Sequence, residues 1–233
     1  MLLVRRPRAL YAAFDRFPTR KGASTHIARF APALFEELGG GLLYVVGDER
    51  LPAHQVEGDV EIIRFSASLP NFLERAVAFG EHLARLLDEA GDSLEIAHFR
   101  DPWSGVPILE LPHRYATVYE VNALPSVELP DAFPSIAPRT LEKIRATEDF
   151  CLGTCDRIVT PSRTTRDFLV RRGVPPAKVE VVPNGADAVP PLPRPFEAPE
   201  RYLLYFGALQ SWQGVDTLFR AFSRLADLPE LRL

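Results

Sequence analysis

The sequence predicts an α/β fold built on a mainly parallel β-sheet. Short apolar segments typical of strands alternate with amphipathic segments typical of helices along the chain. Residues 42–46 form a continuous apolar run, the pattern of a strand covered on both faces of a parallel sheet. The chain has 233 residues, 46% hydrophobic and 25% charged, so it is large and apolar enough to bury a core.

The first strand and the first helix have clear sequence signals. Residues 9–14 are apolar and predict a buried strand. The helix after it carries its apolar stripe at positions 27, 30, 31, 34, 35 and 38. We expect Ser24 or Thr25 to cap the start of this helix, and the three glycines at 39–41 to end it.

A basic loop, Arg20-Lys21-Gly22, lies between this strand and this helix. A helix N-terminus attracts anions, and glycine lets the backbone approach a ligand closely. The loop is therefore either a phosphate site or an ordinary turn with solvated side chains. The loop belongs to a wider basic group near the N-terminus: Arg5, Arg6, Arg8, Arg16, Arg20 and Lys21. This group either contacts an anion, such as phosphate or an anionic membrane surface, or is simply a solvated face.

Further strands are expected at residues 60–65, at the sheet edge, and at 94–99 and 116–121. A long helix is predicted over residues 71–90, and its buried face is predicted to hold Phe72, Val77, Phe79, Leu83, Leu86, Leu87 and Ala90. Residues 122–138 contain four prolines and predict a long loop. Loops of this length are uncommon in compact domains and are often functional.

The pattern continues with a helix at 139–152, a strand at 157–160, a helix capped by Ser162, and a strand at 179–182. Residues 183–185 predict a turn with positive φ at Gly185. Five prolines within 188–199 predict a stiff linker. The expected division is residues 1–187, a linker at 188–200, and the truncated start of a second domain at 201–233. That start has a strand at 202–206, a helix after Gly214 and a strand beginning at 231.

The net charge of −4 argues against nucleic-acid binding. No apolar run has the length of a membrane span, and residues 1–4 do not form a signal peptide, so a cytoplasmic protein is expected. Cys151 and Cys155 are predicted to be reduced, buried thiols, because no His or Cys partners lie nearby in the sequence.

Polar residues stand at the carboxyl ends of the predicted strands, where α/β sheets bind ligands. His98 is interpreted as a base or hydroxyl partner, or as a buried structural histidine. Arg100 either holds a phosphate or pairs with Asp101. Glu120 either contacts a ligand or is paired inside the fold. Glu148 lies on an apolar helix stripe, so an ion pair is predicted for it; no metal site is expected.

Four segments carry a resemblance to a known family: residues 20–26, 156–162, 179–187 and 205–216. Residues 156–162 read DRIVTPS, and residues 179–187 read VEVVPNGAD. Together the segments resemble the retaining family-4 glycosyltransferases of the GT-B fold. The first segment takes the place of that family's glycine-rich loop, and the last resembles the opening of its second domain.

The resemblance implies two Rossmann-like domains, with the acceptor mainly on the first and a nucleotide-sugar donor mainly on the second. No cofactor or essential metal is implied, and transfer would proceed by front-face attack without a covalent nucleophile. His98 and Glu120 would lie near the transferred sugar as catalytic residues. Donor contacts are expected from Lys21, Gly22, Arg100, Asn184, Gly207, Gln213 and Gly214.

The chain departs from the family's pattern in several places. Glu120 stands where the family often has histidine, and Ala208 and Gln213 stand where many members have basic residues. The chain ends before the family's paired glutamates, so we expect it to be inactive by itself. The expected parent enzyme moves a sugar to a glycan or lipid-linked acceptor, as in polysaccharide biosynthesis. The alternatives are a binding half completed by a separate C-terminal half, and a sugar-nucleotide epimerase.

Overall fold

The computed structural model describes residues 3, 6–191, 193, 195, 198–207, 209, 213–225 and 230–232. The chain divides into two compact units, Met1–Glu128 with Ile136–Asn184, and Leu129–Ser135 with Gly185–Leu233. The boundaries predicted at residues 187 and 200 stay predictions.

The first unit is built on an eight-stranded sheet with the order β3-β4-β2-β1-β5-β6-β7-β8. Its strands are β1 (Ala9–Arg16), β2 (Gly41–Val46), β3 (His54–Glu57), β4 (Val60–Phe65), β5 (Ile96–Phe99), β6 (Ala116–Glu120), β7 (Arg157–Thr160) and β8 (Val179–Val181). Every neighbouring pair is parallel except β3–β4. The prediction of a mainly parallel, Rossmann-like sheet is therefore confirmed.

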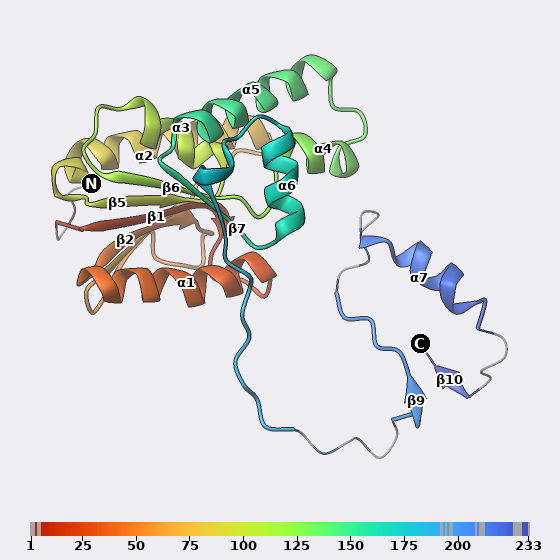
Figure 1. Ribbon diagram of the computed structural model, residues 1–233. Coiled ribbons are helices and arrows are strands. Elements are labelled where there is room, and N and C mark those ends of the chain that lie inside the picture. The colour runs from red at the N-terminus through yellow and green to blue at the C-terminus, as the bar shows by residue number, and fades with distance from the viewer. Residues whose placement is uncertain are drawn as a thin grey trace. The chain divides into compact units, whose positions relative to one another are not determined.

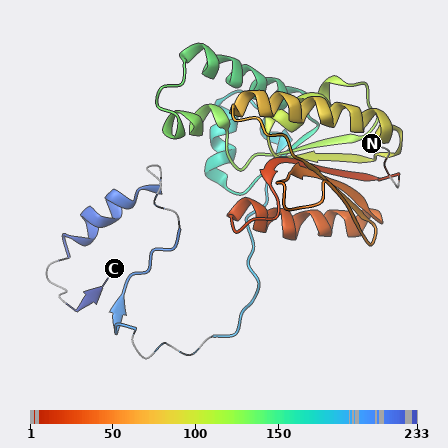
Figure 2. The same cartoon turned by 180° about the vertical axis from the view of Figure 1, so that it is seen from behind.

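Helices cover both faces of this sheet. They are α1 (Gly22–Leu38), α2 (Phe72–Ala90), α3 (Pro102–Glu110), α5 (Pro138–Thr154) and α6 (Arg163–Arg171), with short 3-10 turns at Gly91–Ser93 and Pro176–Lys178. A further helix, α4 (Pro125–Ala132), begins in the first unit and ends in the second. Figures 1 and 2 show α1 on one face and α2, α3 and α5 on the other. Because helices cover both faces of the sheet, successive side chains of residues 42–46 are all apolar and do not alternate with polar ones.

Two apolar cores correspond to the two faces. The smaller core lies under α1 and includes Ile27 and Phe35. The larger core lies under α2, α3 and α5 and includes Phe79 and Phe99. Cys151 and Cys155 are free and buried in the larger core, as predicted.

Several local predictions are wrong. In α2, Val77 is 62% exposed and Ala76 is buried in its place. The helix α1 begins at Gly22 with Lys21 at the cap position, and no side chain caps it. Ser24 is instead buried, and its hydroxyl accepts a hydrogen bond from the Thr19 N–H at 2.8 Å. The physical reason is that a side chain directed inward cannot also reach the exposed N–H groups of the first turn.

Three further corrections concern the sheet edge and two loops. The strand β3 pairs with β4 through a turn with positive φ at Gly58, so β4 is not the edge strand. Residues 122–138 contain the helix α4, so they are not one long loop. Gly185 has no positive φ, which contradicts the predicted turn geometry. The β3 segment is too polar and short to be recognised, and proline at α4's first position fits a helix start.

The second unit contains β9 (Arg201–Tyr202), α7 (Val215–Phe222) and β10 (Leu231–Arg232). The two strands pair in parallel, with α7 between them in the sequence. The observed strand β9 is shorter than the one predicted at 202–206. None of the described residues in 198–232 is buried.

No helix in the described part of the chain combines the length and the apolar character needed to cross a membrane. The predicted basic group is not one patch, because Arg8 precedes β1 and Arg16 ends it. An eight-residue strand spans about 26 Å. Arg8 pairs with Glu95, whose carboxylate lies 2.5 Å away, and Arg5 lies outside the described residues.

Candidate functional site

The sheet order places a candidate site at the carboxyl end of β1. The strand β1 has β2 on one side and β5 on the other, so the chain reverses its direction of winding there. Ligands in open α/β sheets bind in the crevice at such a reversal, beyond the carboxyl ends of the strands. A ligand site is therefore expected at the side chains that end β1, β5 and β6.

Glu120, the last residue of β6, is the centre of a polar cluster. Its Oε2 accepts hydrogen bonds from the Tyr11 hydroxyl at 2.9 Å and from His98 Nε2 at 3.0 Å. Its Oε1 lies 3.1 Å from Arg100 Nε and 2.9 Å from His26 Nε2. The amide of Asn122 also donates to Oε1. Both carboxylate oxygens are thus fully used by the protein.

The cluster extends to the end of β1. Arg100 Nη1 donates to Asp15 Oδ2 at 2.9 Å, so this guanidinium joins β1, β5 and β6. Arg100 does not pair with Asp101, contrary to one of the two interpretations of the sequence. Asp101 instead caps α3 by accepting from Ser104 N at 2.8 Å, and it accepts from Phe14 N at 2.6 Å.

Burial and charge act in opposite directions on these groups. Burial alone would raise the pKa of Glu120, but the contacts with His26, His98 and Arg100 hold that pKa well below its usual range. Burial lowers the pKa of His98, although the neighbouring Glu120 opposes this effect. Burial raises the pKa of Asp101 to about 6. Around neutral pH the cluster therefore holds an ionised Glu120 and a neutral His98.

Aromatic rings fix the imidazoles under α1. The rings of His98 and Tyr11 stack with centroids 5.0 Å apart, and Phe30 lies 4.8 Å from His98. Phe30 also stacks on His26 at 5.6 Å. Of the two histidines, His98 is buried, whereas the His26 ring is partly exposed although its Nε2 atom is buried against Glu120.

The basic loop leads into α1, the helix that carries His26. Gly22 is the first residue of α1, and a Cβ added to it would meet no atom within 4 Å. The fold therefore gives no packing reason for glycine at this position. The first turn of α1 contains no acidic residue, so its N–H groups and the Lys21 ammonium form a positively charged end.

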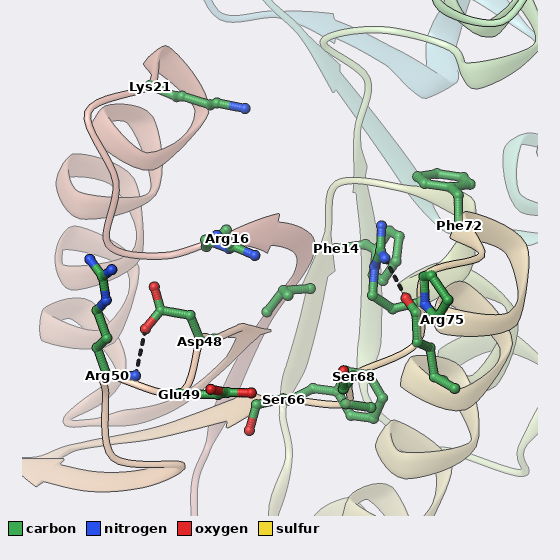
Figure 3. A pocket seen from close by; sticks show the side chains of 16 residues that line it. Phe14, Arg16, Lys21, Asp48, Glu49, Arg50, Ser66, Ser68, Phe72 and Arg75 are labelled. Carbon is green, nitrogen blue, oxygen red and sulfur yellow. Dashed lines mark hydrogen bonds between the residues drawn. The ribbon is translucent and has the colours of Figure 1, made fainter.

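A cavity of about 1030 Å³ lies at the carboxyl ends of β1, β2 and β4, and no residue of the Glu120 cluster is among those that line it. Figure 3 shows Lys21 and Arg50 on one side of it, Phe72 and Arg75 on the other, and Arg16 between them. The loops after β2 and β4 supply Asp48, Glu49, Ser66 and Ser68. The cavity is thus open, polar on one side and aromatic on the other.

The predicted site residues separate into two groups. His98, Arg100 and Glu120 come together in one cluster, whereas Lys21 lines the cavity and Gly22 begins α1. Asn184, Gln213 and Gly214 are exposed, and Gly207 and Gly214 have positive φ. The donor contacts expected of Asn184, Gly207, Gln213 and Gly214 stay predictions. Ala208 lies outside the described residues.

Sequence reasoning gave no site role to four members of the cluster: Tyr11, Asp15, His26 and Asn122. Tyr11 had a usable signal, because a tyrosine hydroxyl inside a buried strand requires a hydrogen-bond partner. His26 stands four residues before Phe30, on the margin of the apolar stripe of α1, which also indicates a partly buried position. Asp15 gave no signal that distinguishes it from a solvated strand end.

Several solved structures have a fold similar to that of this chain. Sucrose-phosphate synthase from Thermosynechococcus elongatus aligns with a TM-score of 0.69 and 19% identity, over 95% of this chain and 60% of that one. A putative UDP-N-acetylglucosamine 2-epimerase from Listeria monocytogenes aligns with a TM-score of 0.50 and 12% identity, over 74% of this chain and 44% of that one. The chain thus spans about 60% of the synthase's length. At these identities the likeness is one of fold.

The family is given by the sequence itself. The comparison with curated proteins yields no match. The model of Glycosyltransferase Family 4, however, matches residues 20–189, which include the basic loop, His26, His98, Arg100 and Glu120 of the cluster, and most of the cavity lining. This match covers well over half of the chain, and the fold agrees with it, so the chain belongs to glycosyltransferase family 4.

Proposed function

We propose that this protein belongs to a retaining glycosyltransferase that moves a sugar from a nucleotide-sugar donor to a glycan or lipid-linked acceptor. The observation that carries the proposal is the Glu120 cluster at the point where the sheet reverses. It brings two imidazoles, a guanidinium and a carboxylate to the place where α/β sheets bind ligands. Membership of family 4 supports the class of reaction.

The contacts within the cluster indicate a separate role for each of its residues. Glu120 has no free acceptor position, so it is a poor base or nucleophile and is better suited to hold its neighbours. His98 is only 3% exposed and is held in the same way. We propose that both are positioning residues and that the partly exposed His26 contacts the sugar. Arg100 and the positive end of α1 would stabilise charge that develops on the donor phosphate.

In a front-face attack, the protein mainly positions the acceptor and the donor and stabilises the charge on the leaving diphosphate. The acceptor hydroxyl attacks the anomeric carbon on the face that the diphosphate leaves. Its proton passes to a phosphate oxygen, and the sugar keeps its anomeric configuration. We propose that no cofactor takes part and that no metal is essential, on the basis of the family resemblance.

The proposal is tested by sugar transfer from a panel of radiolabelled nucleotide sugars to glycan and lipid-linked acceptors. The gene product with any sequence that follows Leu233 should give a product that keeps the donor's anomeric configuration, with or without a chelator. Epimerised or merely hydrolysed donor without transfer would reject the proposal in favour of another activity.

Residues 1–233 by themselves are expected to transfer little or no sugar. The described part of residues 198–232 offers two short strands and one helix without a buried residue, which cannot enclose a nucleotide sugar. The same assay on this chain checks the expectation, and robust transfer would contradict it. An anionic membrane and a separate C-terminal half, the other partners considered from the sequence, stay predictions.

The variant Gly22→Val should weaken donor binding at least tenfold while leaving the fold intact. A side chain at residue 22 points into space that the fold leaves empty, so only a ligand would meet it. The effect is expected only in a protein with both domains complete, and calorimetry of that protein with its preferred nucleotide sugar measures it. The matched control is Gly153→Ala, also a helical glycine with nothing within 4 Å. An unchanged donor affinity in Gly22→Val would remove the loop from the donor site.

A further inference from the structure

Asn184 and Gly185 form the only Asn-Gly pair in the sequence. The backbone nitrogen that follows an asparagine attacks the side-chain amide of that asparagine when the two groups close a five-membered ring, a reaction favoured by their proximity. A glycine in the second position favours the attack further, because it has no Cβ to obstruct the approach and its backbone is unusually free. In a folded protein the pair must also be exposed and held by no other contact.

The structure leaves this pair exposed and unconstrained. The Val182 N–H donates to the Thr160 carbonyl at 2.9 Å and continues the β7–β8 ladder one residue past β8. The residues that follow, 183–191, belong to no helix or strand and are all exposed (Figure 1). Within the described part of the chain, no hydrogen bond involves the Asn184 side chain or the Gly185 N–H.

The fold gives no packing reason for glycine at residue 185. A Cβ added there would meet no atom within 4 Å, and the φ of Gly185 is not in the positive range that L side chains avoid. Alanine therefore fits the same backbone. The substitution Gly185→Ala would change the reactivity of the pair and leave the packing of the protein as it is.

The other two asparagines of the chain are held by hydrogen bonds. Asn71 Oδ1 accepts from two backbone N–H groups at the start of α2, at 2.9 and 3.3 Å. The Asn122 amide donates to Glu120 Oε1. The residues that follow them are Phe72 and Ala123, so neither has an unobstructed backbone nitrogen next to it. Both asparagines serve as internal controls for the reactivity of residue 184.

We propose that Asn184 is a modification site, at which the side-chain amide is lost through a cyclic succinimide to give mostly isoaspartate. The Gly185 nitrogen attacks Asn184 Cγ, a C–N bond forms, and the bond from Cγ to Nδ2 breaks. The departing nitrogen takes up the proton that Gly185 loses and leaves as ammonia. Water then opens the ring at either carbonyl and is the only co-reactant.

The position of the pair gives the modification a structural consequence. The chain divides into its two compact units between Asn184 and Gly185. In the isoaspartate product the main chain runs through the side chain of residue 184, which lengthens the connection by a methylene group and adds a negative charge. The change therefore acts on the connection between the units, and it removes no hydrogen bond of the first unit. The modification is independent of sugar transfer.

The test is ageing of the purified 233-residue chain at neutral and at mildly alkaline pH, followed by peptide mapping with mass spectrometry. Isoaspartate is detected separately, by enzymatic methylation with a protein isoaspartyl methyltransferase and a radiolabelled methyl donor. We expect Asn184 to lose its amide at least ten times faster than Asn71 and Asn122, with isoaspartate exceeding aspartate. The rate should rise with pH, because deprotonation activates the attacking nitrogen.

The variant Gly185→Ala should lose the amide of residue 184 at least ten times more slowly than the parent. Its matched control is Gly153→Ala in α5, also a glycine at which an added Cβ meets nothing within 4 Å, and it should react as the parent does. Unchanged thermal melting shows that both variants fold. A smaller effect of Gly185→Ala, or an equal effect of both variants, would overturn the proposal.

A comparison with the chain unfolded in guanidinium chloride separates the effect of the fold from that of the sequence. The folded chain should lose the amide of Asn184 at no less than a third of the unfolded rate, because the fold does not constrain the pair. A lower rate would mean that the fold protects Asn184 and would overturn the proposal. So would a folded-state rate at Asn184 no greater than those at Asn71 and Asn122, or a product that is mostly aspartate, which indicates direct hydrolysis.

Discussion

The variant Glu120→Gln should lower the free energy of unfolding by about 3–5 kcal/mol, the range for removing one partner of a buried charged pair. The carboxylate is 3% exposed and accepts from Tyr11, His98 and Arg100. An amide keeps one acceptor oxygen and turns the other position into a donor. One pair of donors would then face an N–H₂ group, and the Arg100 charge would lose its nearest buried counterion.

The pH dependence of this loss gives a sharper test. The pKa of Glu120 is lower in the folded protein than in the unfolded chain. Its contribution to stability is therefore complete above the unfolded value of about 4.3 and is lost as the pH falls through the folded value. The difference in stability between parent and variant should be full at pH 7 and should shrink below about pH 4.

Urea unfolding followed by circular dichroism at several pH values measures this difference. The control is Glu81→Gln, which removes the same charge from an exposed position on α2 and should change stability by less than about 0.5 kcal/mol. If Glu120→Gln unfolds like the parent at pH 7, or if its deficit does not depend on pH, the carboxylate is not the ionised centre of the cluster.

A loss of similar size, about 3–5 kcal/mol, is expected for Glu148→Ala. Glu148 lies in α5 with none of its surface exposed. Its carboxylate lies 2.7 Å from Arg172 Nη1 and accepts from the backbone N and the hydroxyl of Ser126, both at 2.6 Å. It therefore joins the start of α4, α5 and the end of α6. Its removal leaves a buried guanidinium and a backbone N–H without this acceptor.

The neighbouring residue supplies the matched control. Asp149 contacts the same arginine, with Oδ1 2.7 Å from Arg172 Nε, but its side chain is half exposed. Pairs that reach solvent contribute about 1 kcal/mol or less, so Asp149→Ala should have a small effect. Urea midpoints of the two variants compare them directly. Similar losses in both would show that burial does not decide the strength of these pairs.

Sequence patterns predicted regular elements better than they predicted boundaries and caps. The strand and helix alternation of the first unit was correct, as was the ion pair of Glu148, because an acid on an apolar stripe has few alternatives. Val77 was assigned to the core, but Ala76 occupies that place. Periodicity alone does not separate adjacent positions at the margin of a stripe, since the packing of α3 against α2 decides which one is buried.

The candidate site shows the same division. His98, Arg100 and Glu120 were found because polar residues at strand ends stand out against apolar strands. Tyr11 and His26 were missed because their roles depend on pairing across β1, β5 and β6 and on the position of α1. Of the basic residues of the cavity, only Arg16 and Lys21 belonged to the predicted N-terminal group, because Arg50 and Arg75 reach the cavity from distant segments.

The sequence by itself determined the α/β class, the covered parallel strands, the family and the strand ends that carry polar groups. These follow from local periodicity and from motifs within short segments. Only the tertiary structure decided that Glu120 is saturated by donors, that the His26 ring is partly exposed, and that one cavity gathers basic and aromatic walls. These properties depend on strand order and on long-range contacts, because burial and hydrogen-bond satisfaction are set by residues far apart in the chain.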